Sequence, residues 1–212
     1  MTARQSIRLG VFAIVAFALG LFVARMVLTP RQAPARLDHA TLLQPPRPLP
    51  PLSFQDQDGR PTTTDFFRQG WTIAFFGFTH CPDVCPTTLA ALAQVKKQLR
   101  TLPPEQQPRV LLVTVDPERD TPSIMKTYVA FFDPSFLGAT GTVAQIGQLA
   151  GAFMVPFARI PLPNGGYTMD HGAGIYFVAP SGAIAAYSSP PLQPDVLARD
   201  YRATVAFAEG SR

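Results

Sequence analysis

The stretch WTIAFFGFTHCPDVCP, residues 71–86, decides how the rest of the chain is interpreted. Residues 71–79 are apolar almost throughout, as expected of a central strand buried on both faces of a sheet. Pro86 suits the first position of a helix, and apolar residues follow it at three- and four-residue steps on one helical face. They are Leu89, Leu92, Val95, Leu99 and Leu102. The only two cysteines, Cys81 and Cys85, therefore lie in a strand-to-helix turn, where α/β folds commonly place their chemistry.

Strands and helices alternate on the C-terminal side of this stretch. Strands are predicted at residues 109–116, 136–140, 175–179 and 184–187, and helices at 121–132, 143–153 and 194–207. Residues 164–166 (NGG) are predicted as a turn, and residues 52–64 as a hairpin around DQDG. The predicted fold class is α/β, a thioredoxin-like sandwich with an N-terminal hairpin, preceded by a single transmembrane helix.

The transmembrane prediction rests on residues 9–28, an apolar and glycine run that only Arg25 interrupts. Its length reaches the roughly 20 residues that a spanning helix needs, and Arg25 lies close enough to the end to reach the headgroups. A cleaved signal peptide is the alternative, with small residues at Ala33-Pro34-Ala35. The long apolar run favours an uncleaved anchor over residues 1–28, and the eight residues before it favour a bacterial protein.

Two further segments follow the anchor. Residues 29–51 are rich in proline and are expected to form a semi-rigid spacer. Residues 52–212 are expected to form the globular domain. Arginines on both sides of the apolar run leave its orientation undecided by charge.

The charge distribution argues against a nucleic-acid partner, although the pI is near 9.4. Residues 1–39 carry five arginines and one aspartate, a net charge of +4, and the whole chain is also +4. Residues 40–212 therefore sum to zero, and the globular part has no basic bias.

The spacing C-x-x-x-C differs from the C-x-x-C of dithiol oxidoreductases. A helix N-terminus is expected to favour the thiolate, the form that binds metal or attacks a disulfide. A structural disulfide is the alternative, but closing so short a loop contributes only roughly 2 kcal/mol. Two thiolates suit Cu(I) and also Zn(II), and a third ligand is expected because two ligands make a poor closed site.

Three histidines are candidates for that third ligand. His39 lies in the predicted spacer and is expected to be solvated. His80 is adjacent to Cys81, and its side chain is expected to point away from that sulfur. His171 lies in a predicted loop before the strand at 175–179, where two glycines permit close approach to another segment.

Three blocks of the chain resemble the Sco/SenC family of copper chaperones. They are FFGFTHCPDVCP at 75–86, VDPERDTP at 115–122 and DHGAGIYF at 170–177, in the family's order. The resemblance covers about residues 50–207. It implies that Cys81, Cys85 and His171 bind copper, as Cu(I) and also Cu(II). Two departures, Gly172 where serine is common and Phe177 where leucine is common, remove no ligand.

The resemblance also implies a role and a place in the cell. A copper chaperone of this family would deliver its ion to the binuclear copper site in subunit II of cytochrome c oxidase. It would need an upstream periplasmic copper donor and a thiol reductant. The expected location is the bacterial inner membrane, with a single span at residues 9–28 and the globular domain on the periplasmic side.

Two enzymatic alternatives use the same cysteines, so whether the protein is an enzyme stays open here. A thiol-disulfide reductase would use Cys81 and Cys85 to keep the partner's copper-ligand cysteines reduced, and it would not need His171. A peroxiredoxin-like peroxidase shares the fold but lacks the expected threonine-and-cysteine geometry.

For the other side chains near the predicted site, we expect a structural role rather than a functional one. The acidic and basic residues of the VDPERD segment are expected to cap a helix and form salt bridges, with support or docking of the site as the alternative. Asp83, between the cysteines, has the same alternative. Three methionines are expected to pack rather than to bind copper. These residues are Asp116, Glu118, Arg119, Asp120, Met125, Met154 and Met169.

Overall fold

The computed structural model describes residues 12–22, 24, 37–163 and 165–210, in two compact units, Met1–Pro34 and Ala35–Arg212. In the first unit, residues 12–22 are helical. Within the described ranges, no helix has both the length and the apolar character needed to cross a membrane. The predicted anchor at residues 1–28 lies partly outside these ranges, so the structure does not confirm a transmembrane helix.

The second unit is built on a mixed sheet with the strand order β1-β10-β9-β4-β5-β6-β2-β3. Strand β4 pairs in parallel with β5, and β5 with β6, whereas the other neighbours are antiparallel. The strands are β1 (Thr41–Pro48), β2 (Ser53–Asp56), β3 (Pro61–Thr63), β4 (Thr72–Gly77), β5 (Arg109–Thr114), β6 (Leu137–Thr140), β9 (Ile175–Ala179) and β10 (Ala183–Ser188). The predicted central strand is β4, and all of its residues are buried.

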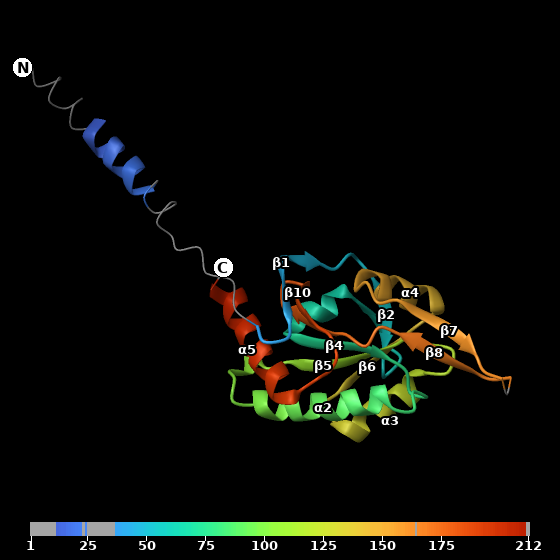
Figure 1. Ribbon diagram of the computed structural model, residues 1–212. Coiled ribbons are helices and arrows are strands. Elements are labelled where there is room, and N and C mark those ends of the chain that lie inside the picture. The colour runs from blue at the N-terminus through green and yellow to red at the C-terminus, as the bar shows by residue number, and fades with distance from the viewer. Residues whose placement is uncertain (1–11, 23, 25–36, 164, 211–212) are drawn as a thin grey trace, which may run out of the picture. The chain divides into compact units, whose positions relative to one another are not determined.

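Helices cover both faces of this sheet. Figure 1 shows α2, α3 and α5 on one face and α4 on the other. The helices are α2 (Val84–Leu99), α3 (Pro122–Phe132), α4 (Val143–Ala152) and α5 (Pro194–Gly210), with 3-10 turns η1 (Thr64–Gln69) and η2 (Pro104–Gln106). The apolar face predicted for α2 is buried at Leu89, Leu92, Val95 and Leu99. The predicted layered α/β architecture is therefore confirmed.

The core between sheet and helices is largely aromatic. Tyr201 of α5 meets Trp71 edge-on at 5.9 Å between ring centroids and Phe177 of β9 at 5.3 Å. On the other face, Phe153 after α4 packs against Phe76 at 5.1 Å. These contacts hold α5 and α4 against the central strands, and the C-terminal end of β4 leads into the cysteine turn.

The proline-rich segment 29–51 differs from the spacer that its composition predicted. Its second half forms β1, which pairs antiparallel with β10 through Thr41–Tyr187 and Pro48–Ala183. Proline cannot donate to a strand ladder, but it is tolerated on an edge strand, and β1 is the last strand on its side of the sheet. The pairing register shifts between Leu42 and Arg47, a stretch that contains two of the prolines.

A second, two-stranded sheet joins β7 (Phe157–Pro161) and β8 (Tyr167–His171). The sequence predicted only the turn at its tip, because neither strand shows the alternation of a half-buried strand. His171 is consequently the last residue of a strand rather than part of a loop. This hairpin carries the predicted histidine ligand to the sheet edge where β4 ends.

Candidate metal centre

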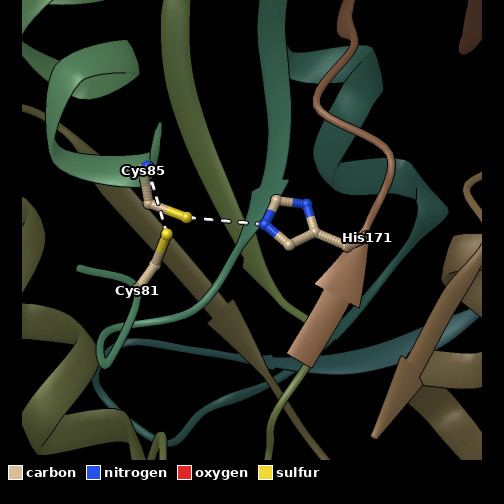
Figure 2. Close-up of side chains that lie close together, drawn as sticks. All are labelled: Cys81, Cys85 and His171. Atoms are coloured by element: carbon tan, nitrogen blue, oxygen red, sulfur yellow. Dashed lines mark hydrogen bonds between the residues drawn. The ribbon is translucent and has the colours of Figure 1, made fainter. Parts of the chain in front are cut away.

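Three side chains converge at the C-terminal end of β4. The sulfurs of Cys81 and Cys85 and a ring nitrogen of His171 all lie within 4.8 Å of one another. Figure 2 shows the imidazole pointing at the two sulfurs from the hairpin side. The cysteines come from the turn into α2, and the histidine comes from 86 residues further along the chain. The three residues predicted as ligands are thus brought together.

The cysteine turn places one sulfur inside the protein and one at its edge. Cys85 is in the first turn of α2 and is fully buried, whereas Cys81 is partly exposed. The Cys85 amide donates to the Cys81 sulfur at 3.4 Å, and both cysteines are free thiols. Gly77 makes this arrangement possible, because a Cβ at that position would lie 2.9 Å from the Cys85 sulfur. This role of Gly77 has no signal in the sequence, because it depends on where the fold places Cys85.

The His171 ring is held between two aromatic edges and one carbonyl. Phe78 and Phe75 meet it edge-on at 5.8 and 6.2 Å between ring centroids. Nδ1 lies 3.1 Å from the Gly172 carbonyl oxygen, and since a carbonyl only accepts, Nδ1 carries the hydrogen. In the neutral ring, Nε2 therefore presents its lone pair to Cys85 Sγ, 3.6 Å away.

Burial sets the protonation of these two groups. It lowers the pKa of His171, which stays neutral at neutral pH. Burial also raises the pKa of the Cys85 thiol far above its usual range, and contact with Cys81 adds to this rise. This direction is opposite to the thiolate that was expected at the helix N-terminus, and its main cause is the burial of Cys85. Without metal, the Cys85 S–H donates to His171 Nε2.

The other two histidines lie outside this group. His80 Nδ1 is 3.1 Å from Thr79 Oγ1 and 3.8 Å from an Asp120 carboxylate oxygen. His39 is exposed, as predicted. The methionines occupy three different environments: Met125 is fully buried, Met154 is exposed, and Met169 is partly buried on β8.

The acidic segment after β5 is more buried than a surface salt-bridge cluster would be. Asp120 is fully buried, and its carboxylate accepts from the Thr79 amide at 3.0 Å and the Thr79 hydroxyl at 2.5 Å. It also accepts from the Thr114 hydroxyl at 2.6 Å. Asp116 is buried as well and pairs with Arg119. Asp83, in contrast, is exposed and makes no side-chain cap to α2.

Comparison with known families gives one match over most of the chain. The family model SCO1/SenC matches residues 42–206. A protein of Stutzerimonas stutzeri whose name describes it as copper-binding is 38% identical over 167 residues, 78% of this chain and 81% of that protein. The SCO2 homolog of Bos taurus mitochondria is 42% identical over 141 residues, 65% of this chain and 52% of that protein. The chain thus spans about half the length of this mitochondrial relative.

A solved structure gives the same fold. The crystal structure of Arabidopsis thaliana ScoI with copper bound is 28% identical, with a TM-score of 0.71 over 74% of this chain and 98% of that one. This likeness supports the thioredoxin-like α/β fold predicted from the alternation of strands and helices.

Proposed function

The chain belongs to the SCO1/SenC family, and from this premise we propose that it is a copper carrier. Cys81, Cys85 and His171 hold the ion. The observation that carries the proposal is the convergence of two sulfurs and one imidazole nitrogen within 4.8 Å, from segments far apart in sequence. Copper is the cargo of this site.

The ligand set fits copper in both oxidation states. Thiolates are soft ligands that suit Cu(I), and imidazole suits copper generally. His171 is neutral, and the lone pair of Nε2 already faces the Cys85 sulfur at 3.6 Å. The Cys85 thiol must lose its proton to bind, so copper uptake releases that proton to solvent.

Exposure suggests how the ion enters and leaves. Cys85 is fully buried, whereas Cys81 and His171 are partly exposed, with Phe75 and Phe78 edge-on to the imidazole. Of the two sulfurs, Cys81 is the one that solvent reaches. An incoming partner ligand would therefore replace Cys81 before Cys85.

The family resemblance supports delivery to the binuclear copper site in subunit II of cytochrome c oxidase. In that role the protein also needs an upstream periplasmic copper donor and a reductant that keeps Cys81 and Cys85 as thiols. A disulfide between them would remove both sulfur ligands.

The free thiols also support a second candidate function, reduction of a partner disulfide. Attack by Cys81 on the partner would form a mixed disulfide, and Cys85 would then displace the reduced partner. The two electrons come from this dithiol, which ends as a Cys81–Cys85 disulfide and needs an external thiol reductant. This reaction has no use for His171.

His171→Ala separates the two functions. We expect a Cu(I) affinity at least about 100-fold lower than wild type, above the range for loss of a mere supporting residue. Cytochrome c oxidase assembly at low copper should fail, while reduction of an oxidised copper-site peptide continues. The measurements are Cu(I) competition against a chelator, oxidase activity, and peptide thiol release.

Matched variants complete the test. His80→Ala removes a histidine beside Cys81 that lies outside the cluster, and it should bind Cu(I) like wild type. Cys81→Ser and Cys85→Ser should abolish both activities. Full oxidase assembly by His171→Ala at low copper would overturn the carrier in favour of the reductase.

A further inference from the structure

The histidine ligand sits on an element that the main sheet does not hold. Strand β8 pairs only with β7 within the described residues, and a lone two-stranded hairpin is marginally stable in water. A cavity of about 270 Å³ lies under the hairpin, with Val115, Ile146 and Met169 in its lining. Apolar packing beneath the hairpin is therefore incomplete, so polar contacts also contribute to holding the strand that carries His171.

Those contacts gather at Tyr167, the first residue of β8. Its hydroxyl donates to Asp116 Oδ1 at 3.0 Å, and its carbonyl accepts from Arg119 Nη1 at 3.2 Å. The ring lies against two guanidinium groups, with Arg119 at 3.9 Å and Arg159 at 4.1 Å from its centroid. Arg159 also pairs with Glu118. We call these contacts of Tyr167 with Asp116, Arg119 and Arg159 the Tyr167 clamp.

The segment that forms the clamp also holds the cysteine turn. Asp116 and Arg119 form hydrogen bonds with Tyr167 of the hairpin. Asp120, one residue further, accepts hydrogen bonds from the amide and hydroxyl of Thr79. Thr79 lies two residues before Cys81. Buried carboxylates in such positions bind tightly, because leaving their partners unpaired in the interior is costly. One segment, residues 116–120, thus contacts both halves of the metal site.

We propose that residues 116–120 set the separation of the two halves of the site, with Tyr167 as a positioning residue for His171. The inference rests on the proposed function for its copper readout. In this proposal the buried Asp116 and Asp120 position the metal site, a role that helix capping alone would not require. Loss of the clamp would release the imidazole and leave the two sulfurs in place, since Asp120 holds the cysteine turn separately.

The test uses the full-length reduced chain, purified with detergent, and Cu(I) as the probe. Tyr167→Ala should lower Cu(I) affinity about 10- to 100-fold, the usual range for a residue that orients a metal ligand. X-ray absorption at the copper edge should show loss of the nitrogen neighbour with both sulfurs retained. Tyr167→Phe keeps the ring between the arginines and should restore most of the affinity.

A second mutation shows whether Tyr167 acts through His171. In a His171→Ala background, Tyr167→Ala should cause no further loss of affinity. Equal losses in both backgrounds would overturn the inference, since they would indicate general destabilisation. Tyr201→Phe is the matched control: it removes a tyrosine hydroxyl bonded to the Gln106 carbonyl at 2.8 Å, away from the site, and should bind Cu(I) like wild type.

A metal-free measurement keeps the two proposals distinguishable. In apo protein, Tyr167→Ala should speed amide hydrogen exchange in β8 and leave α2 unchanged. If wild type binds no Cu(I), the proposed function fails, and this exchange result decides the clamp alone. If wild type binds Cu(I) but Tyr167→Ala binds it equally well, the clamp fails and the copper carrier stands.

Discussion

The two cysteines are four positions apart in the chain, yet their surroundings differ. Cys85 is enclosed by α2, by the β4 backbone at Gly77 and by the His171 ring. Cys81 is partly exposed at the start of the turn. This asymmetry suits a site that keeps one ligand in the interior and presents the other to a partner.

Selective alkylation tests the asymmetry directly. In reduced, metal-free protein near pH 7.5, we expect iodoacetamide to modify Cys81 at least about 10-fold faster than Cys85. The raised pKa of Cys85 leaves almost none of it as thiolate at that pH, and burial blocks access. Mass spectrometry of the peptides measures both rates, with denatured protein as the control in which they become similar. Equal alkylation rates of Cys81 and Cys85 in the folded protein would contradict the burial of Cys85.

At the scale of elements, periodicity and composition predicted the long helices and the buried strands. In α2 the repeat of Leu89, Leu92 and Val95 specifies its buried face without help from the rest of the chain. Strand β1 could not be predicted, because its prolines resemble a spacer and only pairing with β10 makes it a strand. The three side chains that cluster at the metal centre were indicated by the family resemblance, whereas the roles of Gly77 and the Tyr167 clamp depend on contacts between distant segments.

A buried carboxylate binds the backbone of the segment that precedes β1. Asp200 of α5 accepts from the backbone amides of Asp38, His39 and Ala40, at 2.6, 2.9 and 2.7 Å. Asp200→Ala leaves these amides without their acceptor, and we expect the free energy of unfolding to fall by about 2–4 kcal/mol. Urea denaturation of the full chain measures it.

The matched control lies on the same helix. Asp195→Ala removes an exposed aspartate that accepts a hydrogen bond from the Gln98 side chain at 2.7 Å. It should change the unfolding free energy by less than about 0.5 kcal/mol. Similar losses in the two variants would show that Asp200 does not anchor the segment at 38–40.

At the scale of the whole chain, the apolar N-terminal run bears on where the globular domain is held in the cell. Residues 9–28 are apolar enough by sequence to serve as an anchor, and the domain is already ordered by Ala40, which is buried. Residues 41–48, which the composition of residues 29–51 assigned to a spacer, belong to this domain as β1. We propose that the domain lies outside the cytoplasm, where a copper donor and an oxidase would be reached.

A reporter fusion tests this placement. A reporter enzyme that needs disulfide bonds, joined after Arg212, should be active in the full chain, because disulfides form outside the cytoplasm. Deleting residues 9–28 should abolish reporter activity and move the protein from the membrane fraction to the soluble fraction. The mass of the mature chain decides between anchor and signal peptide: an anchor leaves residues 1–28 in place, whereas cleavage near Ala33-Pro34-Ala35 removes them. If this reporter is inactive in the full chain, and a reporter that works only in the cytoplasm is active at the same position, the domain lies in the cytoplasm. That result would contradict the proposed placement.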